Sequence, residues 1–213
     1  MKKLLMAMLF LALLSVITTV GCSSEPTKPP QSEKPQPKAP ELLTGRTAFQ
    51  RVYIAARGWQ RDAQPYRLDS MTTADSKGKD GKSAVWRGAF ASALHRAVKA
   101  YTWSGEDAPD APSRGMNPGT EDNYSPSNSS TQVFDTQFLK IDSDKAFETA
   151  QKHGGDKILS KDPDTPIVYV CDWSRATNEL IWHVIYGDQT AGSRKRHQRR
   201  LHAGGEIKPA PPF

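Results

Sequence analysis

The sequence predicts an α+β fold with two small units, in each of which a helix lies on an antiparallel sheet. Apolar residues recur at helical spacing in two separate stretches, 46–59 and 142–150. Each stretch is followed by segments that alternate apolar and polar residues, as half-buried strands do. An apolar segment that ends in a cysteine and then a proline-rich stretch precede both units. The predicted order is therefore a signal peptide, a tether, a first unit, a connecting loop and a second unit.

Residues 1–21 have the composition of an export signal. Lys2 and Lys3 form a positive start, and residues 4–17 form an uncharged apolar run that is too short for a comfortable permanent membrane span. Small or uncharged residues then lead to Cys22. We therefore expect this segment to direct export and then to be removed.

The end of the signal resembles the lipobox of bacterial lipoproteins, although Thr19 stands where leucine is usual. The resemblance implies that Cys22 begins the mature chain and carries a diacylglyceryl group on its thiol. Several acyl chains on one cysteine anchor a protein to a membrane without crossing it. The cysteine is followed by Ser23 and not by aspartate, which resembles the lipoproteins that Gram-negative bacteria forward to the outer membrane. An ordinary secretory signal that ends near a cysteine is the alternative.

Residues 22–43 are rich in proline, lysine, glutamate and serine. This composition cannot bury enough apolar surface to fold, and its prolines favour an extended conformation. At about 3.1 Å per residue, a linker of this length holds a folded unit some tens of ångströms from the membrane. We therefore predict a lipidated, proline-rich tether.

The first predicted unit spans residues 44–104. Phe49, Val52 and Ala56 share one face of a helix that ends near Gly58. The helix is followed by three predicted strands, at residues 65–71, 84–90 and 97–103. Residues 105–139 are then predicted to form a polar connecting loop.

The second predicted unit spans residues 140–208. Its helix is capped at Asp142 and stopped by two glycines, and its strand pair comprises residues 166–173 and 180–187. The two units match at three places, which indicates an internal duplication of a helix–strand–strand series. The matches are Ala48-Phe49 with Ala146-Phe147, Pro65-Tyr66 with Pro166-Ile167, and Ala84-Val85-Trp86 with Leu180-Ile181-Trp182. Coincidence between two small α+β units is the alternative, because few residues are identical.

The second unit resembles the PepSY domain of exported bacterial proteins. Its helix begins Asp-Lys-Ala-Phe-Glu-Thr-Ala and its second strand contains Leu-Ile-Trp-His-Val; the resemblance covers residues 140–208 and extends weakly to 44–104. It implies a binding or peptidase-inhibiting module without catalytic residues. The Asp and Thr that end the last strand of many family members are missing at residues 201–206, which leaves that strand uncertain.

The net charge of +6 is unevenly placed. Five cationic residues fall within residues 194–202: Arg194, Lys195, Arg196, Arg199 and Arg200. Such a run attracts polyanions. Because an exported lipoprotein meets little nucleic acid, we expect anionic lipid head groups, and no nucleic acid, as partners of this run. A merely solvated basic strand or tail is the alternative.

The sequence contains no pattern typical of a catalytic, metal or cofactor site, so we expect neither enzyme activity nor a bound cofactor. His183 alternates with Trp182 and Val184 on a predicted strand, which favours a solvent-facing side chain over a metal ligand. Cys171 lies in a predicted buried strand, where it is expected to act as a small core residue. With Cys22 acylated, no intramolecular disulfide is possible.

The five tryptophans are many for so polar a chain. Trp86 and Trp182 are predicted to fill the core beneath the helices, whereas Trp103 and Trp173 are candidates for a partner-binding surface, together with the basic run. These features predict a non-enzymatic envelope lipoprotein that binds a protein or peptide, with peptidase restraint as one form of that role. The alternative is a structural lipoprotein whose basic C-terminal segment contacts anionic head groups.

Overall fold

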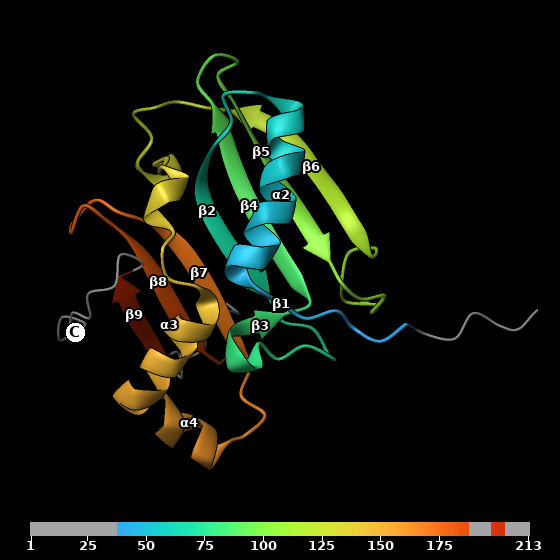
Figure 1. Ribbon diagram of the computed structural model, residues 1–213, viewed down its shortest axis with the longest axis vertical. Coiled ribbons are helices and arrows are strands. Elements are labelled where there is room, and N and C mark those ends of the chain that lie inside the picture. The colour runs from blue at the N-terminus through green and yellow to red at the C-terminus, as the bar shows by residue number, and fades with distance from the viewer. Residues whose placement is uncertain (1–37, 188–196, 203–213) are drawn as a thin grey trace, which may run out of the picture. The chain divides into compact units, whose positions relative to one another are not determined.

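The computed structural model describes residues 38–187 and 197–202 and shows a mixed α+β fold (Figure 1). Seven strands form one antiparallel sheet in the order β6-β5-β4-β2-β7-β8-β9, and two short strands, β1 and β3, form a separate pair. Helices α2 and α3 lie on the same face of the large sheet (Figure 1). The strands are β1 (Leu43–Thr44), β2 (Gln64–Met71), β3 (Lys82–Ser83), β4 (Val85–Ser92), β5 (Ala97–Ser104), β6 (Gly115–Asn123), β7 (Ile167–Ser174), β8 (Glu179–Tyr186) and β9 (His197–His202). The α-helices are α2 (Gly45–Trp59), α3 (Ser143–Ala150) and α4 (Asp156–Lys161).

The same order of elements occurs twice around the middle of the sheet. Helix α2 is followed by β2, β4 and β5, and helix α3 is followed, after α4, by β7, β8 and β9; each set of strands runs outward from the centre. The first strands of the two series pair antiparallel, with Leu68 opposite Cys171 and Asp69 opposite Val170. The α+β prediction is confirmed, and both predicted helix–strand–strand series are present.

The strand register agrees with the sequence match between the two series. Ser70 and Cys171 stand at the same distance after the two matched prolines, and they lie opposite Trp86 and Trp182, respectively. The two tryptophan rings meet with their centroids 6.4 Å apart and an interplanar angle of 81°. Residues that match in sequence therefore occupy equivalent positions in the sheet.

The structure differs from the predicted arrangement in three places. The two series share one sheet instead of forming one small sheet each, because β2 pairs with β7. Strand β6 lies within the predicted loop 105–139; it escaped prediction because its residues are mostly exposed and include Pro118 and Gly119, so the apolar alternation of a half-buried strand is absent. Helix α4 follows the predicted stop, because the chain passes Gly154 at φ +103° and then resumes a helical conformation.

Asp142 caps both helices and Ser143 adds a second cap to α2, although the sequence predicted a cap for the second helix alone. Asp142 Oδ1 accepts hydrogen bonds from the Ser143 amide at 2.7 Å and from the Arg46 amide of α2 at 2.8 Å. Ser143 Oγ accepts from the Gly45 amide at 2.7 Å and donates to the Gly81 carbonyl at 2.5 Å. The N-cap residue of α2 makes no side-chain hydrogen bond of its own. The first two amides of α2 are thus satisfied by residues of the other series.

Trp86, Trp182 and Cys171 are buried in the core, as predicted. The indole N–H of Trp86 donates to the Leu43 carbonyl at 2.9 Å, and that of Trp182 donates to the Ile141 carbonyl at 3.0 Å. Burial raises the pKa of the Cys171 thiol well above its ordinary value. The thiol is therefore protonated at neutral pH and serves as a core group.

Glu106, just after β5, is a buried carboxylate that has no hydrogen-bond partner among the described residues. The residue is 2% exposed, and neither side-chain oxygen meets a donor. We expect Glu106→Met to raise the free energy of unfolding by about 1–3 kcal/mol, because the apolar side chain removes an unpaired buried polar group. Urea denaturation measures the change, and Glu106→Gln, which keeps polar atoms at the site, should gain less. A lower stability of Glu106→Met would contradict this prediction.

Candidate functional site

The two tryptophans predicted for a partner-binding surface pack against other side chains. Trp103 of β5 is 5% exposed, and the guanidinium carbon of Arg51 lies 4.8 Å from its ring centroid. Trp173 near the end of β7 is partly buried, and its ring meets Phe138 at a centroid distance of 5.3 Å. Trp103 therefore offers little surface to a partner, whereas Trp173 is only partly covered.

The other predicted site residues fall at or beyond the limit of the described chain. Four of them lie outside the described residues: Cys22, Arg194, Lys195 and Arg196. Arg199 and Arg200 belong to β9, where they stand opposite Val184 and His183 of β8. Part of the basic run is thus a strand of the large sheet.

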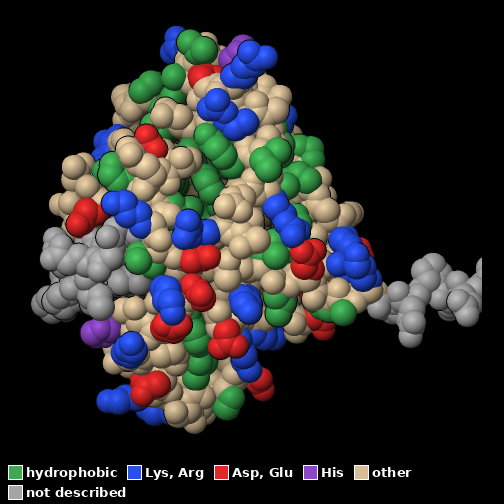
Figure 2. Space-filling view, in the orientation of Figure 1, with side chains coloured by type: hydrophobic (Ala, Val, Ile, Leu, Met, Phe, Trp, Pro, Cys, Tyr) green, Lys and Arg blue, Asp and Glu red, His purple; other side chains and the backbone are tan. Residues whose placement is uncertain are grey.

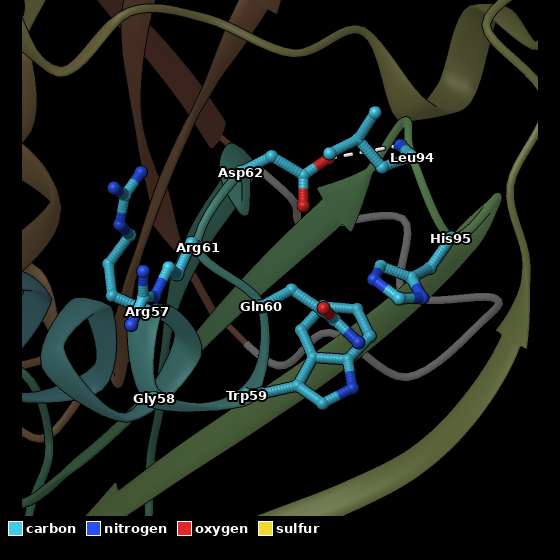
Figure 3. Close-up of a pocket in the computed structure, with 8 residues that line it drawn as sticks. All are labelled: Arg57, Gly58, Trp59, Gln60, Arg61, Asp62, Leu94 and His95. Atoms are coloured by element: carbon cyan, nitrogen blue, oxygen red, sulfur yellow. Dashed lines mark hydrogen bonds between the residues drawn. The ribbon is translucent and has the colours of Figure 1, made fainter.

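A hollow of about 770 Å³ lies where α2 ends (Figure 3). The last turn of α2, the loop to β2 and the turn between β4 and β5 form its walls, and its volume falls within the range of ligand-binding clefts. Figure 3 shows Arg57 and Arg61 on one side and Trp59, Gln60 and His95 on the other. The lining residues are Arg57, Gly58, Trp59, Gln60, Arg61, Asp62, Leu94 and His95.

The end of α2 sets the positions of the aromatic and cationic groups. The Gln60 amide donates to the Ala56 carbonyl at 2.9 Å, and the chain turns so that the buried Ala63 can donate to the Gln60 carbonyl at 3.1 Å. The indole N–H of Trp59 donates to Glu121 of β6 at 2.9 Å. Sequence analysis missed this site, although an aromatic residue between arginines at a helix end (residues 57–61) was a signal that could have indicated it.

Asp62 fixes the opposite wall of the hollow. Its two carboxylate oxygens accept hydrogen bonds from the Ser92 hydroxyl at 2.8 Å and from the Leu94 amide at 3.0 Å. The Ser92 hydroxyl in turn accepts one from the His95 amide at 3.1 Å. Burial acts to raise the pKa of Asp62, but the hydrogen bonds from Leu94 and Ser92 outweigh it and hold the pKa below its ordinary value. The turn that carries Leu94 and His95 is therefore preorganised.

We expect Asp62→Asn to destabilise the protein at neutral pH by about 1–2 kcal/mol, because two hydrogen bonds to a charged acceptor become weaker. Since the folded-state pKa of Asp62 is lowered, its ionised form stabilises the fold above the pKa of the unfolded chain. This contribution is lost as the pH falls through the folded-state value. Thermal melts of both proteins from pH 7 to pH 3 should therefore converge at the acid end. A stability difference that stays constant with pH would contradict this account.

The hollow carries an excess of positive charge. Arg57 and Arg61 are exposed and have no ion-pair partner among the described residues, whereas Asp62 is engaged by its own hydrogen bonds. Figure 2, in the same orientation as Figure 1, shows Lys and Arg side chains gathered near the end of the sheet where the β4–β5 turn lies, with few acidic ones beside them. Leu94 is 82% exposed at the rim. The arrangement suits a ligand that has both negative charge and apolar surface.

A second cluster of charged residues lies on the sheet face opposite the helices. Arg67 is 3.0 Å from Asp69 and 3.3 Å from Asp172, and His183 Nε2 is 3.1 Å from Asp172 Oδ1. These residues alternate with core residues along their strands, which places them on the helix-free face. This cluster spans β2, β7 and β8, where the two series meet, and its charged side chains contact one another.

His183 lies on the sheet face opposite the core residues Trp182 and Val184, as the alternation predicts, but it is less exposed than expected. Its side chain is 14% exposed, and its ring forms a hydrogen bond with Asp172 on the neighbouring strand. Burial raises the pKa of Asp69 in the same cluster, against the opposing effects of Arg67 and Arg87. Because the charged side chains of this cluster pair with one another across β2, β7 and β8, we assign the cluster to the contact between the two series. The hollow remains the candidate binding site.

Within residues 38–187, no three His, Cys, Asp or Glu side chains gather as a metal site requires. In the same part of the chain, no helix is both long and apolar enough to cross a membrane. No family model, curated protein or solved structure matches this chain. The protein is therefore defined by its own structure, as an α+β protein with a hollow that is lined by cationic and aromatic side chains.

Proposed function

We propose that this chain is a lipid-anchored protein of the bacterial envelope that binds a segment of a partner protein without acting on it as an enzyme. The observation that carries the proposal is the hollow at the end of α2. Its guanidinium, imidazole and indole groups are recognition groups, and the Asp62 hydrogen bonds fix one wall before any partner arrives. A preorganised wall reduces the conformational entropy that a partner must overcome on binding.

The N-terminal sequence supports the envelope location. A lipid on Cys22 anchors the chain, and the proline-rich residues that follow supply a long tether. In this arrangement the folded part searches a volume near the membrane, which raises the effective concentration of the binding site for other envelope proteins. The resemblance of residues 140–208 to PepSY modules supports peptidase restraint as one form of the role.

Partner capture tests the proposed function. The lipidated protein is purified from detergent-solubilised envelopes at low and at high salt, and the co-purifying proteins are identified by mass spectrometry. We expect one exported protein to remain bound at high salt, because a full protein interface includes apolar contacts that salt does not screen. Recovery of lipid alone, or of partners that all dissociate with salt, would overturn the proposal.

The alternative function is a structural lipoprotein that contacts anionic head groups. It is favoured by the basic run in residues 194–202, part of which is strand β9. An interaction of this kind depends on charge alone and falls steeply with ionic strength. The salt arm of the capture experiment therefore separates the two functions.

A further inference from the structure

We infer that the hollow at the end of α2 binds an acidic peptide segment of the partner, with an apolar side chain next to its carboxylates. This inference rests on the proposed function and names the chemistry of the bound segment. Arg57 and Arg61 stand on one side of the hollow and His95 on the other (Figure 3). A segment lying across the hollow meets donors on both sides.

The positive charge of the hollow favours a segment with negative charge. Neither arginine forms an ion pair within the described residues, so an incoming carboxylate displaces no internal carboxylate, although the Arg57 guanidinium carbon lies 5.9 Å from the centroid of the Tyr53 ring. The only lining carboxylate, that of Asp62, is occupied by the Ser92 hydroxyl and the Leu94 amide. Asp62 therefore contributes one negative charge to a hollow that also carries the two positive charges of Arg57 and Arg61. An arginine fork also matches the geometry of a carboxylate.

The apolar part of the hollow selects a side chain beside the acid. Leu94 is 82% exposed and gains most from being covered, and Gly58 leaves open space in which an added methyl group would meet no atom. The Trp59 ring is only partly buried, with Lys99 Nζ 5.8 Å from its centroid. Its position is set by the hydrogen bond to Glu121, so little rotamer freedom is lost on binding.

A membrane surface fits this site less well than a peptide. Lipid head groups present charge in a plane, whereas the arginines and His95 lie on opposite sides of a concave site with an aromatic wall. A peptide side chain can enter such a hollow while its neighbours reach the rim. The ligand that we infer is therefore a peptide, and binding to lipid vesicles is measured as the alternative.

Fluorescence anisotropy of labelled peptides tests the inference on the full mature chain. The probe is fluorescein-Ser-Glu-Glu-Leu-Glu-Ser, and the matched peptides replace every Glu with Gln or the Leu with Ser. We expect the probe to bind at low salt and the Gln peptide to bind at least about tenfold more weakly. The Ser peptide should also bind more weakly, because it cannot cover Leu94.

Variants locate the binding to the hollow. Arg61→Glu should weaken probe binding by about tenfold, since a like charge then faces the ligand carboxylates. Lys157→Glu changes the net charge equally at an exposed position on α4 and should leave binding unchanged. Leu94→Ala, at an exposed turn, should reduce binding of the Leu peptide but not of the Ser peptide. Circular dichroism verifies that each variant is folded.

Three results would overturn the inference. The first is equal binding of the Glu and Gln peptides, and the second is an equal loss of peptide binding in Arg61→Glu and Lys157→Glu. The third is that Arg61→Glu keeps peptide binding but loses binding to vesicles that contain anionic phosphatidylglycerol. The proposed function is judged separately. An exported partner that is retained equally by the parent protein and by Arg61→Glu would leave the function standing and remove the hollow from it. If the peptide binds to the hollow but no envelope partner is found, the inference about the hollow stands and the proposed function falls.

Discussion

Trp182→Ala is expected to lower the free energy of unfolding by about 3–5 kcal/mol, the cost of removing a large buried aromatic side chain. Trp182 is fully buried, its ring meets Trp86 edge to face, and its indole N–H donates to the Ile141 carbonyl at 3.0 Å. The substitution therefore opens a cavity between the two series and removes a hydrogen bond. Because single domains are stable by only about 5–15 kcal/mol in total, much of the stability should be lost.

Urea denaturation of the unlipidated Cys22→Ala chain measures this change, and Gly45 supplies a sharper test of its cause. A Cβ atom at Gly45 would lie 2.5 Å from Cη2 of Trp182. Gly45→Ala should therefore destabilise the parent, but cost clearly less once Trp182 is alanine, because only the weaker contact with Cη2 of Trp86, at 3.2 Å, then remains. An equal cost of Gly45→Ala in both backgrounds, which means no coupling, would contradict the packing described.

Cys22→Ala is expected to move the mature protein from the membrane fraction to the soluble fraction. In the proposed function, acyl chains on this cysteine would supply the anchoring, with about 0.8 kcal/mol for each buried methylene group, and two or three chains would make the attachment effectively permanent. Without the thiol no acyl chain is added, and the proline-rich tether has no apolar surface of its own to replace it.

Envelope fractionation and the intact mass of the mature chain measure this effect. Cys171→Ala is the matched control: this cysteine is buried in the core, so its loss should leave the protein in the membrane fraction and the lipid mass in place. If the parent protein is soluble and unmodified after export, residues 1–21 are an ordinary secretory signal and the lipid anchor must be abandoned.

The candidate site shows how far local sequence patterns reach. The helix that ends near Gly58 was predicted from the spacing of Phe49, Val52 and Ala56, and its last turn and the loop that follows supply six of the eight residues that line the hollow. The other two come from the β4–β5 turn, which Asp62 holds through Ser92 and Leu94, residues about thirty positions away in the chain. No periodicity within one segment reports such a contact, so the hollow was not predicted.

The sequence by itself determined the local elements: the two helix–strand–strand series, the burial of Trp86, Trp182 and Cys171, and the match between the two tryptophans. These follow from side-chain periodicity, which is a property of neighbouring residues. Only the tertiary structure decided that β2 and β7 pair, because hydrogen bonding between distant strands leaves no local pattern. That pairing joins both series in one sheet, brings Asp172 and His183 beside Arg67, and lets Asp142 and Ser143 cap a helix of the other series.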